Sequence, residues 1–313
     1  MNRGVLLVAG LVLAACAGNQ APSMAPAPSP MEQLTALAHD SMEGRLTGSP
    51  GSARAARYIA RELERAGVAP GGTDGYFQPV PLVVRTDTAG RSRLVLLPTM
   101  ADLDSVPAER RVRDVNVIGV VRGSDPVLRD EVVIVGAHFD HVGIGRPVDG
   151  DSIYNGADDD ASGTVAVLQI GRALAAGPPP KRTVVLLLTT GEERGLLGTR
   201  YYIAQPSFPM ARTVADLQIE MIGRPDSLAG GPGKAWLTGY ERSTMGDGLK
   251  ASGIPIIPDP RPAQNFFERS DNIAFARIGI PAHTLSSFGL HGDYHRPSDE
   301  IGLIDGAYCA QVI

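Results

Sequence analysis

The segment at residues 183–194, TVVLLLTTGEER, most restricts how this chain can fold. Its apolar run shows no alternation with polar residues, so both faces of the strand it predicts must be covered. A parallel sheet with helices on both faces meets that requirement. The run breaks at Gly191 and leads into Glu192 and Glu193. These adjacent carboxylates repel each other unless a cation lies nearby, although a solvated acidic loop would also explain an isolated pair.

Strands and helices alternate along the rest of the chain. Apolar periodicity predicts helices at 52–66, 161–176, 196–205, 243–251 and 270–277 and from 304 onward, and strands at 79–84, 92–97, 115–121, 132–135, 183–188, 215–221, 235–238 and 281–286. This order predicts an α/β fold with a mixed, mostly parallel central sheet flanked by helices, in a single domain over residues 31–313. The last helix stops abruptly at Ile313, which would fit a truncated gene product.

The bulk composition argues against a nucleic-acid-binding protein. The formal net charge is −5 and aromatic residues make up 5% of the chain, so neither a basic footprint nor stacking platforms are expected. Of the two cysteines, Cys16 lies near the N-terminus and Cys309 near the C-terminus.

The first 15 residues have the pattern of an export signal, a short positive start followed by an apolar run too short to span a bilayer. The sequence LAAC at 13–16 resembles the lipobox of bacterial lipoproteins, which implies cleavage before Cys16 and lipidation of its thiol. The residue after Cys16 is Ala17 and not Asp, which in lipoproteins of this kind implies that the protein is sorted to the outer membrane and faces the periplasm. Residues 16–30 then form a Pro/Ala-rich tether, and the lipid is the only expected membrane contact. A plain signal peptide with an incidental cysteine is the alternative.

Polar residues directly follow the predicted strand at 132–135, where AHFDH contains His138, Asp140 and His141. In an extended segment, residues i and i+2 point the same way. Asp140 could therefore hydrogen-bond one ring nitrogen of His138 while the other nitrogen binds a metal. A single HxDH could also be a polar loop.

Two further acidic features favour a cation. Asp158, Asp159 and Asp160 precede a predicted helix, and although one of them, such as Asp160, could cap it, three exceed what capping requires. Glu220 lies in an apolar strand, where a carboxylate needs a partner, either a metal or an arginine such as Arg224.

The segment HGDYHRPSDE adds His291 and His295, which alone would fit a surface loop equally well. Together, two His, at least one Asp and two Glu from different strand ends suit a borderline hard cation. This set is too large for one tetrahedral ion and predicts two metals roughly 3.5–4 Å apart. The sequence has no HExxH, GxSxG or P-loop motif.

Six motifs in order resemble those of the dizinc exopeptidases, a family that includes bacterial leucyl aminopeptidases and, more distantly, glutamate carboxypeptidase II. They are GAHFDHVG, NGADDDASG, TTGEERGLLGT, IEMIGRPD, FERSDNIAFARIGIPAH and DYHRPSDEI, and the similarity extends from Gln33 onward. The resemblance implies the zinc-dependent exopeptidase fold (phosphorylase/hydrolase-like), two zinc ions that other divalent metals could replace, and peptide substrates.

The same resemblance implies a role for each site residue. One zinc would be held by His138, Asp159 and Glu220, and the other by Asp159, Glu193 and His295, with Asp159 bridging. Glu192 would be the general base, Asp140 would orient His138, Tyr294 would stabilise the oxyanion, and the Asp159–Asp160 peptide would be cis. Many relatives carry Asp in place of Glu220. Three further histidines are expected at the pocket rim or behind the ligands (His141, His291) and in the core (His283).

The resemblance leaves several functions open. The many carboxylates favour an aminopeptidase, which binds a free α-amine, whereas Arg224, Arg269 and Arg277 keep a carboxypeptidase possible. An enzyme of the glutaminyl cyclase type shares the fold but typically uses one zinc. A lipid-anchored binding protein on an inactive peptidase scaffold would lack a ligand or the base, and every such position is filled here. The oligomeric state is not readable from the sequence.

Overall fold

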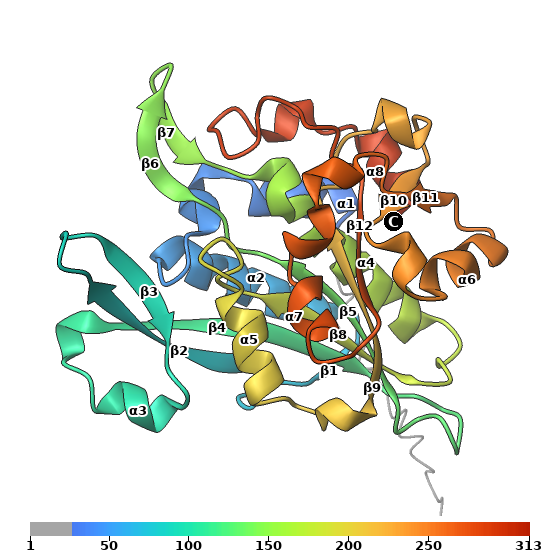
Figure 1. Ribbon diagram of the computed structural model, residues 1–313, viewed down its shortest axis with the longest axis horizontal. Helices are drawn as coiled ribbons and strands as arrows, with labels where there is room; N and C mark the ends of the chain where they lie inside the picture. The colour runs from blue at the N-terminus through green and yellow to red at the C-terminus, as the bar shows by residue number, and fades with distance from the viewer. Residues whose placement is uncertain (1–26) are drawn as a thin grey trace, which may run out of the picture.

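The computed structural model describes residues 27–313 (Figure 1). The predicted signal peptide, Cys16 and most of the predicted tether lie outside these residues. Helix α1 (Pro30–Leu37) starts where the tether was expected to end, and Ser29 caps it in a capping box with Glu32. None of the helices in the described part is long and apolar enough to cross a membrane.

A mixed ten-stranded sheet forms the centre of the molecule, in the order β11-β10-β12-β9-β5-β8-β4-β2-β3, with β1 paired to β4 (Figure 1). The four central strands, β12, β9, β5 and β8, are parallel, which confirms the parallel centre predicted from the strand–helix alternation. Antiparallel pairing begins at β4 on one side and at β10 on the other. The strands are β1 (Ala69–Pro70), β2 (Phe77–Thr86), β3 (Ser92–Leu96), β4 (Arg111–Val121), β5 (Val132–His138), β8 (Thr183–Thr189), β9 (Thr213–Glu220), β10 (Ala235–Leu237), β11 (Ile256–Pro258) and β12 (Ala282–Ser286).

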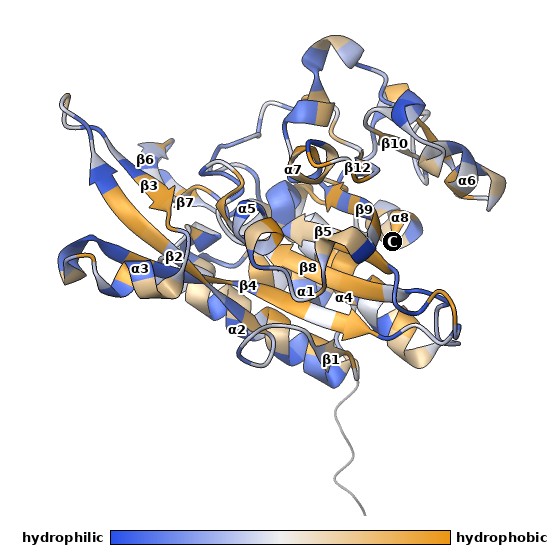
Figure 2. Cartoon of the chain, turned by 60° about the horizontal axis from the view of Figure 1, so that its bottom comes forward, coloured by the Kyte–Doolittle hydropathy of each residue, from blue (hydrophilic) through white to orange (hydrophobic). Residues whose placement is uncertain are grey.

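Helices cover both faces of this sheet. On one face, residues 184, 186 and 188 of β8 pack in the same core cluster as residues of α1, α2 (Pro50–Arg65), α4 (Gly163–Ala176) and α8 (Gly306–Val312). On the other face, residues 185 and 187 pack with Tyr202 of α5 (Leu197–Ala204) and Phe275 of α7 (Asn272–Ala276). The central strands are accordingly the most hydrophobic part of the chain in Figure 2. Burial of both faces explains why the run in β8 is apolar without alternation.

The differences from the predicted elements lie in short or exposed segments. The sequence pattern missed α1, β1, β11, the short helix α3 (Met100–Asp104) and the hairpin of β6 (Gly143–Val148) and β7 (Asp151–Tyr154). Strand β4 begins at Arg111, four residues before the predicted start, because three of its first four residues are charged and give no apolar signal. The predicted helix at 243–251 is α6 (Met245–Ala251).

Candidate metal centre and active site

The predicted site residues meet at the carboxyl ends of the parallel strands. His138 is the last residue of β5 and Glu220 the last of β9, while Glu192 and Glu193 lie three and four residues after the end of β8. Neighbouring parallel strands end at one edge of the sheet, so side chains far apart in sequence come together there. The turn at Ala157–Ser162 adds Asp159, and the loop after β12 adds His295.

A first cluster consists of His138, Asp159 and Glu220. His138 Nε2 lies 3.3 Å from Asp159 Oδ1 and 3.5 Å from Glu220 Oε1. The arginine that the sequence offered as a partner for Glu220 is engaged elsewhere, because Arg224 contacts the carboxylates of Asp293 and Asp299 at 2.8 and 3.3 Å. Arg224 is therefore not the partner of Glu220, whose carboxylate faces His138.

A second cluster contains one more histidine than the sequence predicted. His295 Nε2 lies 3.1 Å from both Asp159 Oδ2 and Glu193 Oε1. His141 Nδ1 lies 2.9 Å from Glu193 Oε1 and 3.8 Å from Asp159 Oδ2, and its side chain is fully buried. His141 was expected at the rim or behind the ligands, but the turn after β5 directs its ring into the cluster itself. Its place three residues after His138 is the only sequence signal for this position.

The atoms that face one another in the two clusters fit a bound cation. Within residues 27–313, five of them are buried and have no hydrogen-bond partner: His138 Nε2, His141 Nδ1, Asp159 Oδ2, Glu193 Oε1 and His295 Nε2. Unpaired buried carboxylate oxygens and ring nitrogens are costly, and a divalent cation would satisfy all of them. Imidazole nitrogen together with carboxylate oxygen is a donor set that zinc accepts. Asp159 has one oxygen in each cluster.

The three consecutive aspartates have three different sets of contacts. Asp160 Oδ1 accepts hydrogen bonds from the backbone N–H groups of Gly163 (2.9 Å) and Met221 (3.0 Å). Asp160 thus binds the first N–H group of the following helix, although the residue in the N-cap position is Ser162. Asp158 Oδ1 accepts from Gly223 N at 2.7 Å, and its Oδ2 lies 2.9 Å from His291 Nε2. Only Asp159 directs its carboxylate to the clusters, and its peptide bond to Asp160 is cis, as expected.

Asp299 holds the turn that carries Asp159. Its carboxylate accepts the backbone N–H groups of Asp158 at 3.1 Å and Asp159 at 3.0 Å. Gly156 begins the same turn with φ +55°, and a side chain there would collide with the Asp159 carbonyl oxygen and the His141 ring. Sequence reasoning did not single out Asp299, although it lies inside the motif DYHRPSDEI.

Asp140 connects the His138 strand with the loop of the two glutamates. His138 Nδ1 lies 3.1 Å from the Asp140 backbone carbonyl oxygen and 3.7 Å from its carboxylate. The carboxylate instead accepts hydrogen bonds from Thr47 Oγ1 at 2.9 Å and from the backbone N–H of Glu192 at 3.1 Å. The carbonyl oxygen is thus the group that can fix the His138 tautomer, in place of the predicted carboxylate.

Glu192 and Glu193 are adjacent in sequence but differ in charge environment. Burial disfavours ionisation of Glu193, yet the close contacts of its carboxylate with the His141 and His295 rings outweigh it and lower its pKa to about 2. Burial raises the pKa of Glu192 well above its ordinary value. No hydrogen bond or ion pair involves the Glu192 carboxylate in the part of the chain that the structure describes. A carboxyl group with a raised pKa is suited to accept and release a proton near neutral pH.

The remaining predicted residues surround this centre. The Tyr294 ring stacks on His295 with centroids 3.9 Å apart, and Tyr294 lines a hollow with Glu220, Arg269 and three further aromatic residues, Trp236, Phe266 and Phe288. His291 lies behind the ligands, bound to Asp158, as expected. His283 is buried between Thr238 and Ser243, which confirms its predicted place in the core.

Comparison with known proteins agrees with this geometry. The model of "Peptidase family M28" matches residues 116–312. Among curated proteins, a probable leucine aminopeptidase 2 of Aspergillus fumigatus is 30% identical over 77% of this chain and 47% of its own length, and a leucine aminopeptidase 2 of Arthroderma otae is 26% identical over 69% of this chain and 42% of its own. The chain thus spans about half the length of the curated relatives it matches.

Three solved structures show the same fold at low sequence identity. An aminopeptidase from Aneurinibacillus sp. strain AM-1 has a TM-score of 0.63 at 17% identity, covering 90% of both chains. BSAP, a zinc aminopeptidase from Bacillus subtilis, has a TM-score of 0.64 at 14% identity, covering 90% of this chain and 91% of its own. A Porphyromonas gingivalis glutaminyl cyclase has a TM-score of 0.61 at 15% identity, covering 91% and 93%. These matches confirm the predicted fold class.

Proposed function

Because the chain belongs to peptidase family M28, we propose that it is a metal-dependent aminopeptidase that hydrolyses the N-terminal peptide bond of peptides. The observation that carries this proposal is the convergence of two clusters of buried, unpaired donor atoms that share Asp159, next to Glu192 with its raised pKa. The curated relatives named leucine aminopeptidases support the choice of reaction.

The two clusters would hold two zinc ions or other divalent metals. His138, Asp159 and Glu220 would hold one, and Asp159, Glu193 and His295 the other, with His141 as a further donor to the second. Bound metal ions of this kind lower the pKa of a coordinated water and polarise the scissile carbonyl. Glu220 reaches the first cluster although many relatives use the shorter Asp, because the end of β9 places its Oε1 3.5 Å from His138 Nε2.

The chain's own residues would move the proton and stabilise the developing charge. Glu192 would take a proton from the attacking water and deliver it to the amine that leaves when the peptide bond breaks. Asp140 keeps Glu192 in place by accepting the hydrogen bond of its backbone N–H group at 3.1 Å. Tyr294 would donate a hydrogen bond to the oxygen that becomes negative, and burial, which raises the pKa of its hydroxyl, keeps this proton bound.

The positions of the arginines favour an aminopeptidase over a carboxypeptidase. Arg224 is neutralised by Asp293 and Asp299, and Arg277 lines hollows that contain none of the metal-binding candidates. Of these three arginines, only Arg269 lines the hollow beside Glu220 and Tyr294, with its guanidinium 5.0 Å from the centre of the Phe266 ring. The excess of carboxylates attracts a free α-amine. The presence of two complete clusters also favours two metals over the single zinc typical of a glutaminyl cyclase.

The substitution Glu192→Gln tests the assignment of the base. It should leave the metal content unchanged, because Glu192 is in neither cluster, and lower kcat by roughly 10²–10⁴-fold. Metal analysis together with a panel of free and N-blocked peptides would separate the reaction classes. Full activity of the variant with metal bound would rule out Glu192 as base, and cleavage of N-blocked peptides would point to a carboxypeptidase.

We further propose that the protein is exported and anchored to the outer membrane through a lipid on Cys16, facing the periplasm. The support is the sequence LAAC at 13–16 and the Pro/Ala-rich segment that follows. Mass spectrometry of the mature N-terminus would detect the lipid. Cys16→Ser should release the protein from the membrane fraction, and a variant that stays bound would contradict lipid anchoring.

A further inference from the structure

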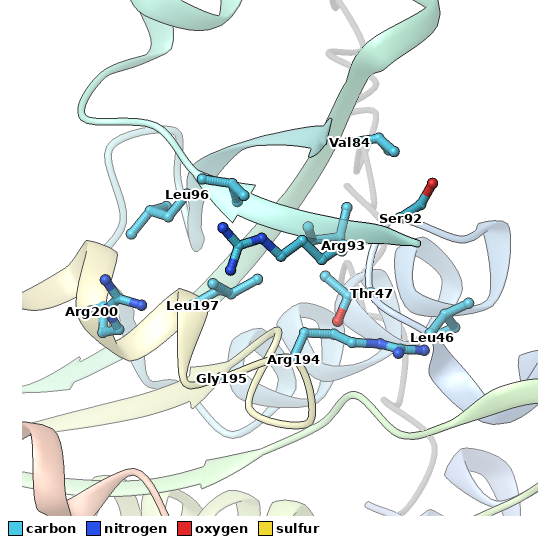
Figure 3. A pocket seen from close by; sticks show the side chains of 12 residues that line it. Leu46, Thr47, Val84, Ser92, Arg93, Leu96, Arg194, Gly195, Leu197 and Arg200 are labelled. Atoms are coloured by element: carbon cyan, nitrogen blue, oxygen red, sulfur yellow. The ribbon is translucent and has the colours of Figure 1, made fainter. Parts of the chain in front are cut away.

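A basic groove of about 640 Å³, shown in Figure 3, has Arg194 in its lining, the residue that follows Glu193 of the proposed active site. One wall is the hairpin of β2 and β3, and the other is the loop and first turn of α5 that follow the two glutamates. Its apolar lining includes Leu94 and Leu96 of β3 and Leu197 of α5. A groove of this size can take a peptide of a few residues.

All the charged side chains that line the groove are positive. Three arginines line it, Arg93, Arg194 and Arg200, and no Asp or Glu is among the lining residues. None of the three guanidinium groups forms an ion pair within residues 27–313, in a chain whose net charge is −5. In Figure 3, Arg93 and Arg200 lie toward one end of the groove, whereas Arg194 extends past Thr47 toward Leu46. Unpaired arginines around an apolar floor suit an anion attached to an apolar chain.

Two residues that line the groove, Arg194 and Thr47, lie next to or contact residues of the proposed active site. Arg194 directly follows Glu193, and Thr47 donates a hydrogen bond to Asp140 at 2.9 Å. The hollow beside Glu220 and Tyr294 lies on the side of β9, and the groove lies on the opposite side, beyond β8. A peptide whose first residue occupies that hollow would extend across the strand ends toward the groove.

We propose that this groove binds the part of the substrate that follows the scissile bond, and that Arg93 and Arg200 receive its free C-terminal carboxylate. The preferred substrates are then short peptides with apolar residues after the first and a negative charge at the far end. This inference rests on the proposed aminopeptidase function, because it assigns the leaving portion of the peptide to the groove. An acidic side chain near the end of an amidated peptide offers the same chemistry.

The test compares three matched apolar tripeptides: one with a free carboxylate, its C-terminal amide, and an amide with Glu at the last position. We expect KM of the free acid to be about fivefold or more below that of the plain amide, with similar kcat, because the carboxylate contacts lie away from the reacting bond. The difference should shrink as salt is raised, since all three arginines are exposed. The Glu peptide shows whether a side-chain carboxylate can replace the terminal one.

The double substitution Arg93→Gln and Arg200→Gln should raise KM of the free acid to that of the amide. Arg57→Gln, at an exposed arginine of α2 outside the groove, is the matched control and should keep the preference. Cleavage of acid and amide with equal KM, or a preference that survives the double substitution, would overturn this inference alone. Absence of N-terminal cleavage for all three peptides would overturn the aminopeptidase function and this inference with it.

Discussion

Arg45 is a fully buried side chain whose loss should destabilise the whole site. Its guanidinium donates hydrogen bonds to the backbone carbonyl oxygens of Leu37 (2.8 Å), Phe139 (2.7 Å), Asn155 (2.6 Å) and Gly156 (2.9 Å). These carbonyls belong to the end of α1, the loop after His138 and the loop before Asp159. Arg45 therefore ties together the two loops that supply Asp159 and His141.

The expected effect of Arg45→Met follows from these contacts. Among the hydrogen bonds of the described residues, only the Gly156 carbonyl has a second donor, Ala161 N at 3.3 Å. Methionine would leave the other three carbonyls buried without a partner, at about 1–3 kcal/mol each. Removal of a buried charge offsets part of that loss. We expect the free energy of unfolding to fall by about 3–6 kcal/mol, a large share of the 5–15 kcal/mol typical of a folded domain.

Urea unfolding of the metal-free protein measures this change directly. Arg45→Lys should fall between wild type and Arg45→Met, because an ammonium group can reach fewer of the carbonyls. Arg54→Met is the matched control: Arg54 forms a partly exposed ion pair with Glu43 at 2.8 Å, and its loss should cost no more than about 1 kcal/mol. An Arg45→Met variant within about 1 kcal/mol of wild type would refute this account of the site.

Two further substitutions test the surroundings of the centre. The carboxylate of Asp271 accepts a hydrogen bond from Thr189 Oγ1, at the end of β8, at 2.6 Å, and burial raises its pKa to about 6. The folded state therefore holds this proton more tightly than the unfolded state, and stability is lost as pH rises from about 4 to about 6. In the metal-free protein, Asp271→Asn should therefore raise the free energy of unfolding at pH 7 by up to roughly 3 kcal/mol, with a higher Tm, and should leave Tm unchanged at pH 4. Equal gains in Tm at both pH values would contradict the raised pKa. His141→Ser should weaken binding of the second metal roughly 10–100-fold in a chelator titration and leave the first metal bound. Unchanged affinity for both metals would remove His141 from the ligands.

The sequence predicted the architecture where periodicity reflects burial. The apolar run of β8 required cover on both faces, and the structure divides its residues between two core clusters. The motifs named His138, Asp159, Glu193, Glu220 and His295. His138, Glu193 and Glu220 come together because they end or follow strands of the same parallel sheet, whereas the turn after β7 supplies Asp159 and the loop after β12 supplies His295. Strand position accounts for three of these residues, and the resemblance to the family motifs supplied the other two.

Contacts made by irregular segments could not be read from the sequence. Arg45 bonds the Asn155 carbonyl across 110 residues, and Asp299 bonds the Asp158 backbone across 141. Neither pairing leaves a periodic signal, because backbone groups of a loop can accept partners from any part of the chain. The same reason explains His141, whose direction depends on the turn after β5.

The sequence by itself determined the fold class, the parallel strands that end at the site, and the identity of most side chains that gather there, because burial and strand order impose a regular pattern on residue types. Only the tertiary structure decided that His141 joins His295 in contacting Glu193, that Arg224 is neutralised, and that three other arginines border one groove. Those outcomes depend on how loops pack against one another, and packing between distant segments is set by three-dimensional contact, not by local periodicity.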